Sequence, residues 1–228
     1  MNVLSRGSWL LFSIVCAASP GRAQTLDAIL ERLDTAARQF HSFSAHIKRT
    51  DFTSVLNESE VMNGDVKMKR GKSGVIGVMD FSDPNPHTIA IAGHTVQRYY
   101  PKAGVVEIYD TTKFAAIRDE YLLLGFGTPV AELRKDYDLK LGGSETLDSV
   151  KVTRMDLTPK SAEMLKYIRK IELWIPDGQS NPMQEKITEP SKDTILVLYS
   201  DVAVNPPLPD SAFELKLPPN VRRLNPKK

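Results

Sequence analysis

The sequence predicts a mainly β fold with helices, in which a strongly curved antiparallel sheet forms a barrel or half-barrel. Three observations support this fold class. One amphipathic helix opens the mature region, short β-rich runs separated by turn formers follow it, and an apolar helical stretch interrupts these runs at mid-chain. Many short strands joined by short connections are typical of such curved sheets.

The helix is predicted from Thr25 to about Phe40. Thr25 is a suitable N-cap, and Asp27 suits the positive end of the helix dipole. Apolar residues recur at intervals of three, four and seven, which predicts one buried face. These residues are Leu26, Ile29, Leu30, Leu33, Ala36, Ala37 and Phe40.

Two series of strands are predicted on either side of the mid-chain stretch. Alternation, β-branched residues and bounding turn formers indicate each of them. The first series is Phe43–Thr50, Val61–Lys69, Val75–Phe81, Thr88–Ala92, Thr95–Tyr100 and Val105–Tyr109. The second is Asp138–Leu141, Val150–Leu157, Ile168–Ile175, Met183–Glu189, Thr194–Tyr199 and Ala212–Leu217.

The mid-chain stretch, residues 112–135, is predicted to form two short helices broken at Gly125-Phe126-Gly127. Thr128 is the expected N-cap of the second, with Pro129 at its first position. The stretch carries too many apolar side chains to remain in water. They either complete an ordinary core or close the open face of the sheet over an apolar interior.

Residues 1–23 are predicted to be a secretory signal peptide. Arg6 supplies the positive charge of the n-region, a short apolar run follows, and Ala23 is the small residue at the cleavage site. The mature chain then starts at Gln24, and cleavage after Ala18 is the competing interpretation. Residues 24–228 are expected to form a single domain. The product is expected in the periplasm of a Gram-negative host.

The composition excludes several classes of function. The signal removes two of the 30 basic residues, so 28 face 28 acidic ones and the mature net charge is about zero. Basic and acidic residues are interspersed, which argues against nucleic acid as a partner. Cys16, the only cysteine, leaves with the signal.

No metal, cofactor or enzyme activity is predicted. The four histidines show no ligand spacing, and no nucleophile elbow, phosphate-binding loop or dinucleotide motif occurs.

Five stretches carry a resemblance to a known family. They are LDAILERLDTAARQFHSFSAHIKR, GDVKMKR, IAGHTVQRYYP, MDLTPK and AFELKLPPNV, in an order that spans nearly all of residues 26–221. In these the chain resembles the periplasmic outer-membrane lipoprotein carriers, the LolA-like proteins. The resemblance implies an unclosed β-barrel (half-barrel), covered by an N-terminal helix and a two-helix lid, around a hydrophobic cavity.

The resemblance and the pattern together suggest which side chains line this cavity. Val75, Met79 and Phe81 are expected to point inward, although a one-residue slip in register would place Ile76 and Val78 there instead. The complete expected set is Leu30, Leu33, Phe40, Met68, Val75, Met79, Phe81, Phe114, Ile117, Leu124 and Phe126.

Arg70 ends GDVKMKR, where the family carries an arginine that ties the barrel to the lid. The alternative is that Lys69 and Arg70 are solvated charges at a strand end. Gly71 stands where the family usually has proline, which leaves the local backbone geometry open.

The resulting hypothesis is a monomeric carrier of lipoprotein acyl chains, or of another lipid, towards the outer membrane. An inner-membrane exporter and an outer-membrane acceptor are implied as partners by the resemblance alone. The alternative is a periplasmic sensory or regulatory module of the same fold that binds lipid or lipoprotein as a stress signal.

Overall fold

A computed structural model describes residues 25–72, 74–112 and 124–226. The predicted signal peptide lies outside the described residues. So do Phe114 and Ile117, with the first of the two helices predicted at mid-chain.

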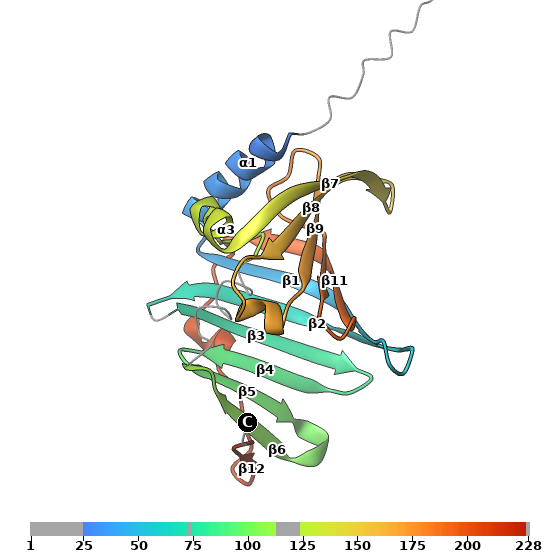
Figure 1. The fold of residues 1–228 in the computed structure, drawn as a ribbon. Coiled ribbons are helices and arrows are strands. Elements are labelled where there is room, and N and C mark those ends of the chain that lie inside the picture. Colours follow the sequence, from blue (N-terminus) through green and yellow to red (C-terminus); the bar gives the residue numbers. More distant parts are fainter. Residues whose placement is uncertain (1–24, 73, 113–123, 227–228) are drawn as a thin grey trace, which may run out of the picture.

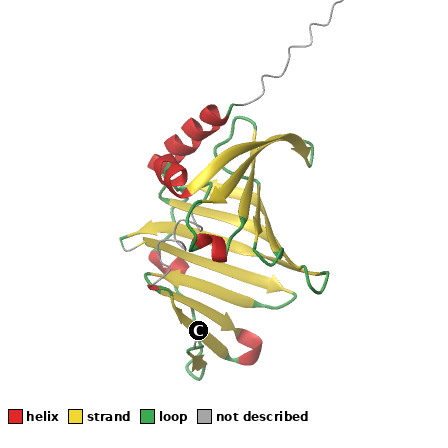
Figure 2. Ribbon diagram, in the orientation of Figure 1, coloured by secondary structure: helices red, strands yellow, loops and turns green. Residues whose placement is uncertain are grey.

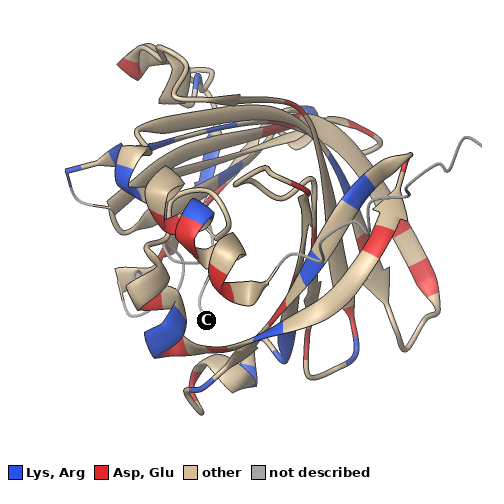
Figure 3. Ribbon diagram, turned by 90° about the horizontal axis from the view of Figure 1, so that it is seen from above, with Lys and Arg blue, Asp and Glu red and all other residues tan. Residues whose placement is uncertain are grey.

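The described strands form one twelve-stranded sheet in the order β12-β6-β5-β4-β3-β2-β1-β11-β10-β9-β8-β7. Its two edge strands, β12 and β7, do not pair with each other, so the sheet curves without closing (Figures 1 and 3). The unclosed antiparallel half-barrel is therefore confirmed. In chain order the strands are β1 (Ser42–Thr53), β2 (Glu58–Gly71), β3 (Gly74–Asp83), β4 (His87–Ala92), β5 (Thr95–Tyr100), β6 (Val105–Asp110), β7 (Tyr137–Leu147), β8 (Val150–Pro159), β9 (Lys170–Pro176), β10 (Gln184–Thr188), β11 (Thr194–Val204) and β12 (Arg222–Leu224).

Helix α1 (Leu26–Gln39) forms as predicted. The Thr25 hydroxyl accepts a hydrogen bond from the Ala28 N–H at 3.3 Å, and Asp27 lies in the first turn. Its apolar stripe packs against the strands at one end of the sheet (Figure 2). Among the described residues, no helix has the length and apolar character needed to cross a bilayer.

Helix α3 (Val130–Asp136) begins one residue later than predicted, and the predicted Thr128 cap is wrong. Pro129 occupies the N-cap position, and its side chain offers no acceptor. The Asp34 carboxylate of α1 instead accepts the Val130 N–H at 3.1 Å. A contact across 96 residues of sequence replaces the local cap because α1 and α3 lie side by side (Figure 1).

The predicted strand Ala212–Leu217 is also wrong. Asp210–Phe213 is a short 3-10 helix on the outer side of the sheet, where Lys69 pairs with Asp210 and lies 4.6 Å from the centre of the Phe213 ring. The prolines on both sides of this segment have no N–H to give to a ladder, which disfavours a strand. The last strand is β12, which pairs in parallel with β6.

Most of the buried hydrophobic residues that the structure describes fall into two clusters. The first, called the helix cluster, joins α1 and α3 to the inner side of β8–β10. The second, called the sheet cluster, covers the inner side of β1–β4 and includes Phe126. Phe126 belongs to residues 124–129, which are called the mid-chain segment below. Five further cluster positions come from outside these helices and strands: Phe40, Leu124, Tyr137, Met164 and Val197.

Candidate functional site

The inner face of β1–β4 carries an apolar cluster with members from all four strands. On β3, Val75 and Phe81 are each 2% exposed, and Met79 is partly buried against the same cluster. All three therefore lie on the inner side, while Ile76 and Val78 fall on the outer side by alternation. The strand thus presents the side of the register that the sequence analysis expected.

The candidate cavity residues fall into two groups. Phe40, Met68, Val75, Phe81 and Phe126 belong to the sheet cluster, with Met79 packed against it. Leu30, Leu33 and Leu124 belong to the helix cluster, so the structure does not bring the two groups into one cluster. Leu30 and Leu33 pack α1 against strands β8–β10.

Phe126 covers the inner face where β1 and β11 meet. It is 4% exposed, and its ring centre lies 4.1 Å from that of Phe43 and 5.1 Å from that of Tyr199. Aromatic pairs at these distances add to the free energy gained from burial. One aromatic side chain thus seats the mid-chain segment on the sheet.

Gly127 follows and lies against the Phe40 ring. A Cβ at this position would come within 2.8 Å of Phe40 Cδ1, so glycine permits the close approach of the backbone. The carbonyl oxygen of Gly127 accepts a hydrogen bond from Arg70 Nη2 at 2.7 Å. Arg70, at the end of β2, is therefore bonded to the backbone of the mid-chain segment instead of being only solvated.

Glu185 on β10 is a carboxyl buried in this apolar interior, with 4% of its surface exposed. It accepts a hydrogen bond from the Tyr199 hydroxyl at 3.0 Å through Oε2, and Oε1 is buried without a hydrogen-bond partner among the described residues. Desolvation raises the pKa of Glu185 to about 7, and the bond from Tyr199 opposes that rise.

A second polar group lies on the inner side at the β5–β6 end of the sheet. Arg98 Nη1 donates to the Tyr100 hydroxyl at 3.3 Å, and in the described ranges Arg98 Nε is buried without a hydrogen-bond partner. On β6 the Tyr109 hydroxyl donates to Glu107 Oε2 at 2.7 Å, which raises the pKa of Tyr109. Burial raises this pKa further.

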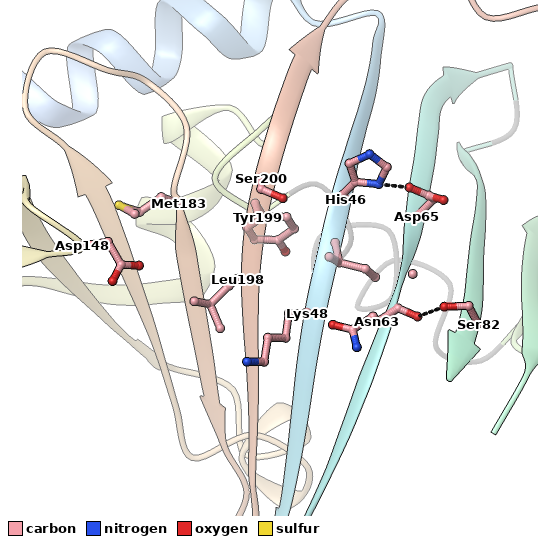
Figure 4. A pocket seen from close by; sticks show the side chains of 12 residues that line it. His46, Lys48, Asn63, Asp65, Ser82, Asp148, Met183, Leu198, Tyr199 and Ser200 are labelled. Carbon is pink, nitrogen blue, oxygen red and sulfur yellow. Dashed lines mark hydrogen bonds and ion pairs between the residues drawn. The ribbon is translucent and has the colours of Figure 1, made fainter. Parts of the chain in front are cut away.

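The outer side of the sheet has a different character. A cavity of about 570 Å³ opens over β11, β1 and β2, where His46 and Asp65 are paired across neighbouring strands (Figure 4). Most of the residues that line it are polar, and the His46 and Asp65 side chains are more than half exposed. In the described ranges, no three His, Cys, Asp or Glu side chains are grouped so as to hold a metal ion.

Arg98 and Glu185 were missed by the sequence analysis, although their strands carried a usable signal. In Thr95–Tyr100, Arg98 alternates in step with Val96 and Tyr100, and in the strand at 183–189, Glu185 alternates in step with Ile187. A charged residue on the apolar side of an alternating strand is out of pattern and points to a buried polar group.

No protein-family model and no curated protein matches the chain. Its fold is similar to that of an uncharacterized conserved protein from Thermus thermophilus, with a TM-score of 0.54 and 12% identity over 89% of this chain and 100% of that one. A LolA superfamily protein from Nitrosomonas europaea has a TM-score of 0.41 and 14% identity, over 85% of this chain and 99% of that one. The Pseudomonas aeruginosa MucA/MucB complex has a TM-score of 0.46 and 12% identity, over 82% of this chain and 60% of the matched chain. At these identities the likeness concerns the fold alone.

Proposed function

We propose that the protein binds the acyl chains of lipoproteins, or of another lipid, on the inner face of β1–β4 beneath the mid-chain segment. The observation that carries this proposal is an apolar inner face covered by a segment seated through Phe126 and bonded to the sheet through Arg70. The binding is non-covalent.

An apolar face of this kind suits the task of shielding an acyl chain from water. Each methylene moved out of water is worth about 0.8 kcal/mol, so a long acyl chain costs on the order of 10 kcal/mol when it is left exposed. A carrier has to shield the chain and then release it. Release requires the cover to open, which breaks the Arg70–Gly127 hydrogen bond and the ring contacts of Phe126.

The predicted signal peptide would place this activity in the periplasm. Residues 24–228 would act there as a single domain and a monomer, receiving lipid from an inner-membrane exporter and passing it to an outer-membrane acceptor. These partners follow from the LolA-like resemblance, and binding of an acyl probe is the step that the purified protein can test.

Met79→Glu tests whether the inner face binds the ligand. Met79 is partly buried on that face, so a carboxylate there is expected to reduce affinity for a fluorescent fatty acid by about tenfold or more. Because the position is only partly buried, the fold is expected to tolerate the charge. Fluorescence titration measures the affinity, and circular dichroism checks the fold.

The matched control is Val78→Glu, one residue away on the outer side of β3. It is expected to bind the probe as the wild type does. Equal affinity in the wild type and Met79→Glu, or no binding of any acyl probe by the wild type, would contradict the proposal.

Arg70→Leu tests whether the mid-chain segment acts as a cover over the ligand. The bond from Arg70 to the Gly127 carbonyl is charge-assisted but Arg70 is exposed, so its loss is expected to cost only about 1 kcal/mol. That is enough to raise the association and dissociation rates of the probe by about fivefold when the cover limits both. Stopped-flow fluorescence measures both rates.

Lys67→Leu is the control for this variant, since Lys67 lies on the outer side of the same strand. If Arg70→Leu has the same association and dissociation rates as the wild type, Arg70 does not hold the cover in place and acts only as a solvated surface charge.

A further inference from the structure

We infer that Arg98 and the Tyr100 hydroxyl bind the anionic head group, a carboxylate or a phosphate, of an amphiphile whose hydrocarbon chain lies along the inner face from β4 towards β1. This inference rests on the proposed function, because it names the class of ligand that the same face takes.

Arg98 occupies the inner side of β5 by register. It pairs with Ile89 on β4, which pairs with Met79 on β3, and Met79 pairs with Val66 on β2. These three partners belong to the sheet cluster or pack against it. Arg98 is therefore a guanidinium at the end of a row of apolar side chains.

The hydrogen bonds of Arg98 are incomplete. A guanidinium carries five N–H donors, and within the part of the chain that the structure describes Arg98 makes one bond, to the Tyr100 hydroxyl. Its Nε is one of two buried side-chain atoms that have no hydrogen-bond partner in the described part of the chain. A buried donor without an acceptor is costly, which favours an acceptor that arrives with a ligand.

The described residues provide Arg98 with no carboxylate within 4.0 Å. Glu107 lies directly across from it on β6, but its Oε2 is bonded to the Tyr109 hydroxyl. The contrast with other arginines is clear, since Arg49 Nε lies 2.7 Å from Asp51 and Arg154 Nε lies 2.9 Å from Asp156. Those two arginines already have their anions.

The spacing of the row suits an amphiphile. Val66 pairs with Ala45 on β1, so the row from Arg98 to Ala45 crosses four strand spacings, about 19 Å in all. That distance is on the scale of a long acyl chain laid across the strands. A head group bound at Arg98 therefore places the hydrocarbon chain over Ile89 and Met79. The free end of the chain then points towards Phe126.

The shared chemistry of the head group is an oxyanion. Guanidinium groups bind carboxylates and phosphates through paired N–H donors, whereas an ester or an alcohol leaves the charge unpaired. The inference therefore separates an acidic lipid from a neutral one.

The experiment compares cis-parinaric acid with its methyl ester, two fluorescent probes that differ only in the charge of the head group. The full mature chain is expected to bind the acid about tenfold more tightly than the ester. In Arg98→Gln the preference is expected to disappear through a loss of affinity for the acid, and Arg98→Lys should keep part of it. The source of the anion is distinguished by competition with dodecanoate and with dodecyl phosphate.

The control is Arg223→Gln, an exposed arginine on β12, which should keep the preference for the acid. Equal binding of acid and ester by the wild type overturns the inference even if Arg98 variants fail to fold, and leaves the proposed function standing. Binding of neither probe overturns the proposed function itself. Displacement by either dodecyl competitor, with dodecanol inactive, supports the inference and identifies the preferred oxyanion.

Discussion

Truncation of Phe126 to alanine is expected to lower the free energy of unfolding by about 3–5 kcal/mol, the usual range for a buried phenylalanine. The side chain is 4% exposed and contacts the rings of Phe43 and Tyr199. Its loss removes apolar burial and both ring contacts, and it leaves a space on the inner face. Urea unfolding of both proteins measures the change.

The functional part of this expectation is rescue by ligand. If the space under Phe126 belongs to the ligand-binding face, a saturating fatty acid is expected to restore more stability to Phe126→Ala than it adds to the wild type, because it refills the apolar space. Phe213→Ala is the matched control, since Phe213 is buried beside Lys69 on the outer side. Rescue of both variants to the same degree would argue against a binding face at Phe126.

Replacement of Glu185 by glutamine is expected to remove a pH dependence worth about 3 kcal/mol. Burial raises the pKa of Glu185 from 4.5 to about 7, and each pH unit between the folded and unfolded values corresponds to about 1.4 kcal/mol. The folded state keeps its proton up to about pH 7, whereas the unfolded state loses it near 4.5. The folded state therefore binds more protons in this window, and stability falls as pH rises through it.

Urea unfolding between pH 4.5 and 8 tests this expectation through the difference between the two proteins. Relative to Glu185→Gln, the wild type is expected to lose about 3 kcal/mol across the window and little more above it. The comparison of slopes is independent of any constant cost of the glutamine amide. The same slope in both proteins would mean that Glu185 does not titrate in the window, and exposed Glu58→Gln should keep the wild-type slope.

Local sequence was a good guide wherever one element decides its own structure. The helix from Leu26 to Gln39 and its Thr25 cap follow from periodicity and capping within a few residues. The predictions failed where a distant partner decides. Asp34 caps α3, and Lys69 pairs with Asp210 in a 3-10 helix that overlaps the start of the predicted strand Ala212–Leu217.

The positions of the candidate site residues were predictable only in part. Alternation could not sort Met79 and Phe81 from Val78, because Val75–Phe81 is apolar on both faces, and only the structure places Met79 and Phe81 on the inner side. Alternation would have marked Arg98 and Glu185 as charges on an apolar side. It does not reveal that Leu30 and Leu33 pack in one cluster and Phe81 in another, because that depends on which strands α1 reaches.

Period and turn chemistry are local properties, so the residues alone predict an amphipathic helix and many short antiparallel strands. Which charges have partners depends on the three-dimensional structure. Arg49 and Arg154 have carboxylates beside them, while Arg98 Nε and Glu185 Oε1 are buried without hydrogen-bond partners among the residues that the structure describes. Strand register fixes those distances, and the register depends on how the whole sheet curves.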